Sequence, residues 1–168
     1  IYCDFSGYTD MAIGLAYLLR IRLPTNFLRP YGAQSLTQFW RRWHITLSFW
    51  LRDYLYIPLG GNRRGRARQV INLLVTMVLG GLWHGANWTF VIWGALHGVG
   101  LALGHLLGRS MRMPKWLGLL LTFHFVTLAW VFFRAPNLDT AWRVLSGPFT
   151  QSYGNAGPVL GTLAFPIL

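Results

Sequence analysis

Histidines are the residues of this sequence best suited to chemistry, and His84 has the most informative position among the five. It interrupts the middle of a forty-residue stretch, from Gln69 to Gly108, that contains no Asp, Glu, Lys or Arg. An ionisable side chain at membrane depth is costly, so by default it marks a functional site or a water-filled path. The alternative is a neutral His84 that hydrogen-bonds a neighbouring helix and ties a bundle together.

His44 lies in a different setting, directly after Arg41, Arg42 and Trp43. It is either an ordinary histidine of a membrane surface or a second site group near the cytosolic mouth of a path that contains His84. The remaining histidines are expected in helix packing or at the interface: His97, His105 and His124.

The carboxylates do not suggest acid–base catalysis by a carboxylate pair. The sequence has four Asp and no Glu. Asp10 lies in an apolar context and either pairs with an Arg of another segment or lines a polar cavity. Asp53, beside Arg52, is expected to form a structural ion pair. A single Cys excludes an internal disulfide, no metal site is expected, and neither a GxSxG elbow nor a Gly-rich phosphate loop is present.

The elements that position these residues are those of a membrane protein. The 168 residues are 54% hydrophobic and only 11% charged, against about 25% charged in soluble domains. That composition excludes an ordinary soluble enzyme. The net charge of +11 comes from short clusters of Arg between long uncharged stretches, whereas a nucleic-acid module spreads its basic residues over a soluble face. We therefore expect no nucleic-acid partner.

Several uncharged stretches approach the roughly 20 residues that cross a bilayer as a helix. Residues 70–82 and 88–107 are expected to form a hairpin that turns at Trp83–Asn87, and residues 116–133 a further span. Residues 5–19 are a weaker candidate because they include Asp10, and another span is expected to open at Val159.

Ten of the fourteen Arg lie between Arg20 and Arg68, and a second basic cluster contains Arg109, Arg112 and Lys115. The positive-inside rule places both clusters in the cytosol, which requires an even number of crossings between them and favours the hairpin. Fifteen residues of helix from Gln69 place His84 roughly 22 Å into a core about 30 Å thick.

Residues 35–54 predict an interfacial helix. Ser35 and Gln38 have the spacing of a capping box. Apolar residues then recur at helical spacing, with basic residues on the other side, as in a helix that lies in a membrane surface. The apolar side consists of Leu36, Phe39, Trp40, Trp43, Leu47, Trp50, Leu51 and Tyr54. A turn-rich basic loop, residues 58–66, follows. We interpret the tryptophans as interface anchors and packing residues rather than as a platform that stacks on sugars.

Three ordered motifs make this chain resemble the membrane-bound O-acyltransferase (MBOAT) family. They are FWRRWHITLS at residues 39–48, LRDYLYIPLGGNR at 51–63 and GGLWHGA at 80–86. The second motif favours the branch that acetylates polysaccharides over the exporters that add D-alanine to teichoic acids. The similarity extends from Phe5 to about Phe149. Because members are much longer, residues 1–168 are expected to be one partial membrane domain, without its N-terminal helices and C-terminal end.

The resemblance implies a central tunnel in which acyl groups pass from a cytosolic donor to an acceptor at the other face, with His84 as the active-site histidine and His44 as the second motif histidine. His84 would take the proton of a hydroxyl that attacks an acetyl thioester. Asn87 or a backbone N–H would orient this ring or stabilise the oxyanion. His44 would help to position the donor. A basic loop would attract the phosphates of acetyl-CoA, or would only orient the protein by the positive-inside rule. The basic residues of this loop are Arg63, Arg64, Arg66 and Arg68.

We therefore predict an all-α integral membrane protein, a multi-pass helical bundle with interfacial or re-entrant helices, in the bacterial inner membrane. It would move acetyl groups from acetyl-CoA toward an exported polysaccharide such as alginate, with an extracytoplasmic acetyltransferase partner and no bound cofactor. Two alternatives remain open: an enzyme of the same family with another acyl group, such as D-alanine, and a non-catalytic channel or scaffold.

Overall fold

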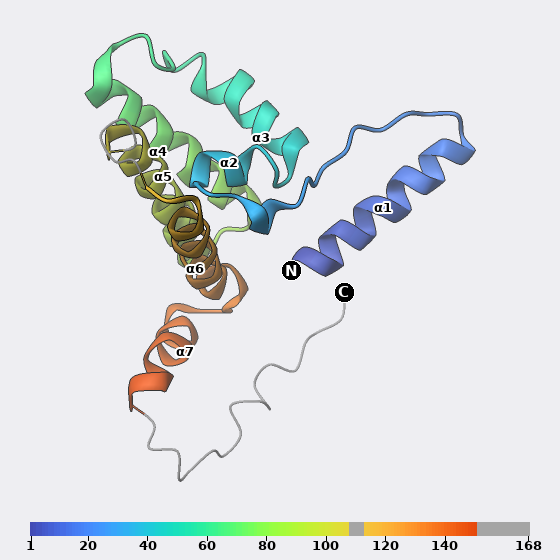
Figure 1. Ribbon diagram of the computed structural model, residues 1–168. Coiled ribbons are helices and arrows are strands. Elements are labelled where there is room, and N and C mark those ends of the chain that lie inside the picture. The colour runs from blue at the N-terminus through green and yellow to red at the C-terminus, as the bar shows by residue number, and fades with distance from the viewer. Residues whose placement is uncertain (108–112, 151–168) are drawn as a thin grey trace.

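Helices make up all of the regular structure that the computed structural model shows in residues 1–107 and 113–150, the part of the chain that it describes. Three long helices form its body: α4 (Gly65–His84), α5 (Trp88–Leu107) and α6 (Lys115–Arg134). Figure 1 shows them side by side, with the shorter α2 and α3 packed across them and α1 and α7 at the margins. The predicted all-α class is confirmed.

The hairpin of α4 and α5 is the tightest contact between helices, as its uncharged sequence predicts. Glycines make this possible. A Cβ atom on Gly81 would lie 2.3 Å from the carbonyl oxygen of Phe90, and one on Gly94 would lie 2.3 Å from that of Met77. Both distances are far below van der Waals contact, so only glycine lets the two backbones approach this closely. The hairpin therefore fixes the position of His84, the last residue of α4, relative to α5.

Two helices of the described part are long and apolar enough to cross a membrane: α5 and α6. Their bounds match the second arm of the predicted hairpin and the predicted span at 116–133. The predicted first arm is also helical, within α4, but this helix is less apolar because it includes Arg66, Arg68 and Asn72. The span expected from Val159, and the cluster residues Arg109 and Arg112, lie outside the described residues.

The prediction of one helix over residues 35–54 is wrong. The chain forms α2 (Leu36–Trp40), α3 (Ile45–Leu51) and a π-helical turn, η2 (Arg52–Tyr56), with a break between α2 and α3. Ser35 caps α2 as predicted, since its hydroxyl accepts a hydrogen bond from the Gln38 amide at 3.2 Å. The apolar stripe is divided: Phe39 is buried in the protein core, whereas Tyr54 is exposed.

Aromatic rings dominate the core, where Phe39 and Trp43 are buried together with Ala33 and Val126. The two rings stack at 5.6 Å, and the Trp43 ring also lies 5.0 Å from that of Trp130 on α6. The segment around α2 is therefore anchored inside the bundle and does not lie on its surface along its whole length.

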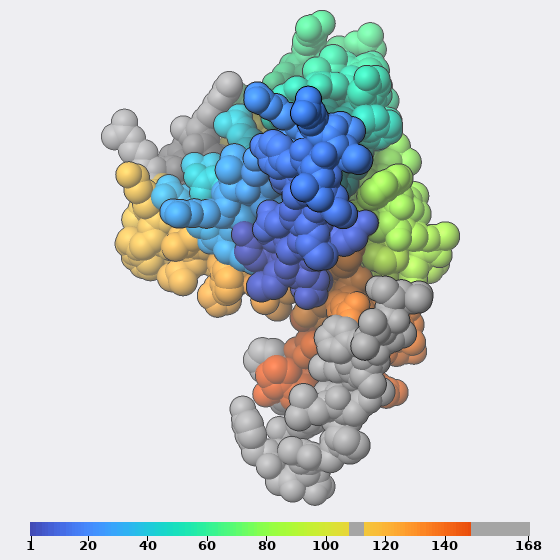
Figure 2. Space-filling model, turned by 90° about the vertical axis from the view of Figure 1, so that its right-hand side faces the viewer, coloured from blue at the N-terminus to red at the C-terminus, as the bar shows by residue number. Residues whose placement is uncertain are grey.

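The N-terminal helix α1 (Tyr2–Leu18) joins this core only through its first turns. The ring of Phe5 contacts those of Phe27, at 5.1 Å, and His44, at 4.8 Å. An extended segment then returns the chain to the short 3-10 turn η1 (Pro30–Gly32) and to α2. Figure 2 shows α1 at the front of the molecule, with α6 to one side and the α4–α5 hairpin to the other. Asp10 is exposed on α1, so the structure shows neither of its two predicted roles.

A helix that the sequence did not predict, α7 (Leu138–Thr150), follows α6. Asn137 begins it, because its side-chain oxygen accepts a hydrogen bond from the Thr140 amide at 2.8 Å. The predicted ion pair of Asp53 is confirmed: both of its carboxylate oxygens accept hydrogen bonds from Arg52, at 2.7 and 3.1 Å.

Candidate active site

His84 ends α4 at the bottom of the hairpin, where aromatic rings of three helices surround it. Its imidazole lies 4.9 Å from the ring of Phe133 on α6, 5.6 Å from that of Trp93 on α5 and 5.0 Å from that of Trp83. All three contacts are edge-to-face, the arrangement that aromatic quadrupoles favour. These contacts restrict the ring of His84 to a narrow range of orientations.

His44 reaches the same place from the break between α2 and α3. Its backbone is left-handed, with φ 42° and ψ 58°, a conformation that costs free energy in any residue other than glycine. The break follows from hydrogen bonds that a continuous helix would not allow. The side-chain oxygen of Asn26 accepts from the Thr46 amide at 3.1 Å and from its hydroxyl at 2.8 Å, and the Asn26 carbonyl accepts from the Ile45 amide at 3.1 Å. Asn26 thus caps α3 from a distant part of the chain.

Both histidines line one cavity of about 360 Å³. The rest of the lining is aromatic or aliphatic. It comes from helices α1 to α6, from the residue before α1 and from the break between α2 and α3: Ile1, Phe5, Trp40, Trp43, Leu47, Trp83, Trp93, Trp130 and Phe133. An apolar hollow with two convergent imidazoles is a typical small-molecule site, because a few polar groups orient the ligand and the apolar wall removes it from water.

The surroundings of His44 determine its protonation state. Burial lowers the pKa of its imidazole, and a positive charge on His84 would lower it further. His44 is therefore neutral at physiological pH. Its Nδ1 atom is buried and has no hydrogen-bond partner among the described residues, so it is available to another group.

The structure places the other predicted site residues away from this cavity. The Asn87 side chain is already engaged: its Nδ2 donates to the carbonyl oxygen of Pro136 at 2.8 Å and its Oδ1 accepts from the Thr89 amide at 3.2 Å. Asn87 thereby begins α5 and joins it to the segment after α6, so its geometry does not favour a role at the oxyanion. The four predicted phosphate-attracting residues lie at or before the first turn of α4, at the opposite end of that helix from His84, and all are exposed: Arg63, Arg64, Arg66 and Arg68.

Sequence reasoning did not place the tryptophans in the wall of a site, whereas the expectation that His97 serves helix packing is confirmed. Trp40, Trp43, Trp83 and Trp93, which we interpreted as interface anchors and packing residues, line the cavity together with Trp130. His97 is completely buried behind them, 4.7 Å from the Trp93 ring and 5.4 Å from that of Trp40. A signal was present: Trp93 and His97 are four residues apart, hence on one face of α5. Since the carbonyl of Trp93 can only accept, the Nδ1 of His97 carries the proton of their 3.0 Å hydrogen bond.

Comparison with known proteins assigns this arrangement to a family. The model of the membrane-bound O-acyltransferase family matches residues 1–138. The chain is 54% identical over 155 residues to the probable alginate O-acetylase AlgI of Azotobacter vinelandii, covering 89% of this chain and 30% of the relative. It is 53% identical over 152 residues to the peptidoglycan O-acetyltransferase of Helicobacter pylori, covering 88% and 29%.

A more distant relative is the teichoic acid D-alanyltransferase of Streptococcus thermophilus, at 30% identity over 167 residues, 84% of this chain and 40% of that protein. The chain thus spans about three tenths of the length of the acetyltransferases that it matches.

Proposed function

Since this chain belongs to the membrane-bound O-acyltransferase family, we propose that it is the part of a membrane O-acetyltransferase that holds the reacting groups. The proposed protein takes acetyl groups from a cytosolic donor, acetyl-CoA, and passes them across the membrane to hydroxyl groups of an exported polysaccharide. Relatives named for alginate and for peptidoglycan are almost equally similar, so the proposal specifies a glycan hydroxyl and not one polymer.

The observation that carries this proposal is the single cavity that joins His84 to His44. Acetyl transfer from a thioester requires a hydroxyl oxygen to attack the carbonyl carbon while a base removes the hydroxyl proton. In our proposal His84 accepts that proton, the new C–O bond forms and the C–S bond breaks. The proton then passes from His84 to the departing thiolate, which restores the neutral imidazole and completes the cycle without any other reactant.

The aromatic wall serves the same reaction by excluding water. A thioester is open to hydrolysis, and a water-free cavity limits this loss and strengthens every electrostatic interaction in it. We propose that His44, neutral because of its burial, binds the donor or the acceptor hydroxyl beside His84. It holds no charge that an apolar cavity would have to accommodate.

The remaining parts of the proposal concern the whole protein. We propose that the basic start of α4 faces the cytosol, as the positive-inside rule favours, and that its positive charges raise the local concentration of acetyl-CoA by long-range attraction of the phosphates. The chain then lies in the inner membrane of a bacterium as part of a multi-pass bundle, and an extracytoplasmic acetyltransferase completes transfer to the polymer. No bound cofactor is required, since acetyl-CoA is a substrate.

The alternative acyl group has some support, because a D-alanyltransferase is among the relatives. Competition between acetyl and D-alanyl thioesters, measured with the whole protein in membrane vesicles, distinguishes the two enzymes. Preferential transfer of D-alanine would overturn the acetyl assignment while leaving the acyltransferase proposal intact.

Substitution of the two cavity histidines in the whole protein tests the site. We expect cells with His84→Ala to lose O-acetyl groups from the exported polysaccharide, and cells with His44→Ala to lose a large part, at membrane protein levels matched to the wild type. His124→Ala is the control, since this exposed histidine on α6 is not part of the cavity lining. Retained acetylation in His84→Ala would remove this residue from the chemistry and favour a channel or scaffold.

A further inference from the structure

A second cavity, of about 390 Å³, lies at the other end of the α4–α5 hairpin. The loop before α4, the first turns of α4 and the end of α5 contribute its lining: Asn62, Gly65, Arg66, Gln69, His105 and Leu106. The 20 residues of α4 separate its first residue, Gly65, from His84 by about 28 Å. This cavity is therefore distinct from the one that contains the two site histidines.

The loop that forms one wall is held in place by its own hydrogen bonds. The Tyr56 hydroxyl donates to the side-chain oxygen of Asn62. Asn72, buried on α4, donates from Nδ2 to the carbonyl oxygen of Gly61 at 3.1 Å. Gly60 and Gly61 have φ of 113° and 50°, which lets the chain turn back onto α4. The wall is thus preformed.

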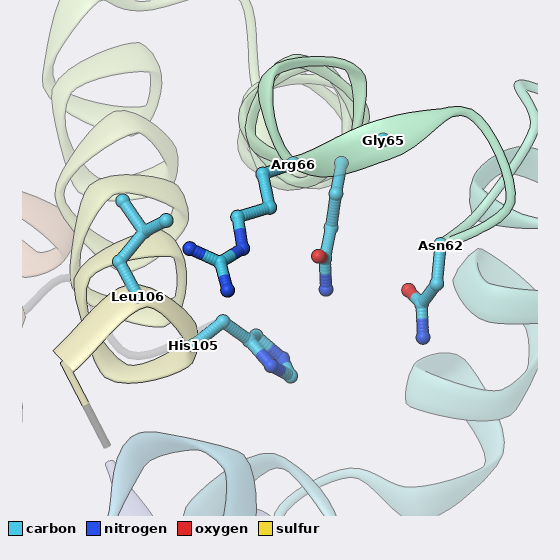
Figure 3. A pocket seen from close by; sticks show the side chains of 6 residues that line it. Asn62, Gly65, Arg66, His105 and Leu106 are labelled. Atoms are coloured by element: carbon cyan, nitrogen blue, oxygen red, sulfur yellow. The ribbon is translucent and has the colours of Figure 1, made fainter. Parts of the chain in front are cut away.

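The polar side chains that line this cavity can all donate hydrogen bonds: Asn62, Arg66, Gln69 and His105. Figure 3 shows the guanidinium of Arg66 and the ring of His105 extending toward each other, with the side chain of Asn62 across the cavity on the loop. The two ion pairs found in the described residues, Ile1 with Asp4 and Arg52 with Asp53, leave Arg66 without a carboxylate there. Such a set of donors suits an anion with several acceptor oxygens, and the planar guanidinium matches phosphate in particular.

Leu106 lines the cavity, and other apolar side chains share the last turns of α5 with it. Leu103, Leu106 and Leu107 are each about half exposed, at 49%, 47% and 51%. A cationic hollow next to exposed leucines fits an amphipathic molecule that has an anionic head and hydrocarbon chains. Basic pockets between membrane helices bind the head groups of acidic lipids in this way. We propose that this cavity binds the phosphate of an anionic phospholipid, with Arg66 and His105 on the phosphate oxygens and the acyl chains along α5.

Lipid titration of the purified whole protein tests the proposal. Dioleoylphosphatidylglycerol is added to the protein in neutral detergent and the midpoint of thermal unfolding is followed, since a ligand that binds the folded state raises it. Dioleoylphosphatidylcholine, acetyl-CoA and inorganic phosphate are titrated in parallel. The variants are Arg66→Gln alone and together with His105→Gln. Arg22→Gln, an exposed residue outside both cavities, removes the same charge elsewhere.

We expect phosphatidylglycerol to raise the midpoint and phosphatidylcholine to leave it unchanged. Arg66→Gln should weaken the affinity for phosphatidylglycerol by about ten- to hundredfold, because a hydrogen bond to a charged group is lost, while Arg22→Gln should bind as the wild type does. If acetyl-CoA or inorganic phosphate gives the Arg66-dependent shift and the lipid does not, the lipid assignment is overturned. If no probe gives such a shift, the phosphate site itself is refuted. Neither result depends on acetyl transfer, so the proposed function is tested separately.

Discussion

Gly94 should tolerate no side chain, because it lies where α5 passes closest to α4. A Cβ atom there would meet the Met77 carbonyl oxygen at 2.3 Å and the Val78 Cα at 3.0 Å, whereas ordinary contact begins at 3.4 Å. Backbone atoms cannot rotate away as a flexible side chain would. In Gly94→Ala the two helices must therefore separate by about 1 Å at this point.

The separation has two consequences of different size. Overpacking of this kind costs about 1–3 kcal/mol of the free energy of unfolding. The effect on catalysis should be larger, since His84 ends α4 while Trp93, the ring beside it, belongs to α5. A displacement of about 1 Å between reacting groups can lower a rate roughly 10²-fold. We expect Gly94→Ala to remain in the membrane, to unfold at a lower temperature and to lose most of its acetyl transfer.

The assay compares the O-acetyl content of the polysaccharide and the unfolding midpoint between Gly94→Ala and Gly104→Ala in the whole protein. Gly104 lies on the same helix, yet a Cβ atom on it would have nothing within 4 Å. Glycine is about 1 kcal/mol less favourable than alanine inside a helix, so Gly104→Ala should leave the stability unchanged or raise it. It should leave the activity unchanged. Equal stability and activity in the two variants would refute the claim that the close approach of α4 and α5 positions His84.

Two further predictions concern the break at His44. Asn26→Ala should lower the free energy of unfolding by about 0.5–2 kcal/mol, the range for loss of a helix cap, as measured by thermal unfolding. An unchanged midpoint would show that α3 keeps its N-terminus without this side chain. Burial lowers the pKa of His44, so the folded chain binds a proton at this imidazole less readily than the unfolded chain does. The free energy of unfolding is therefore unaffected by this group above about pH 6.5 and decreases as the pH falls below that value. The wild type should therefore lose more stability than His44→Gln between pH 7 and pH 5, and parallel pH profiles would contradict this reasoning.

Local sequence was sufficient for the apolar helices α5 and α6 and for nearly all of their extent. The uncharged stretch at 88–107 is α5 with the same bounds, and residues 116–133 lie within α6. Ser35 was recognisable as a cap because capping depends on side chains a few residues apart. His84 was recognisable as a candidate because its neighbours in the chain are apolar, and an ionisable side chain in an apolar membrane segment costs free energy.

Tertiary structure decided how these parts combine. The apolar periodicity of residues 35–54 continues through His44 without interruption, and the break there is set by Asn26, which caps α3 from outside that segment. The sequence suggested that Asn87 acts in the site, but its side-chain amide donates a hydrogen bond to the carbonyl oxygen of Pro136, 49 residues away. Only packing brings His44 and His84 into one cavity. Sequence patterns report interactions between near neighbours in the chain, whereas the site depends on contacts between distant segments that no local pattern encodes.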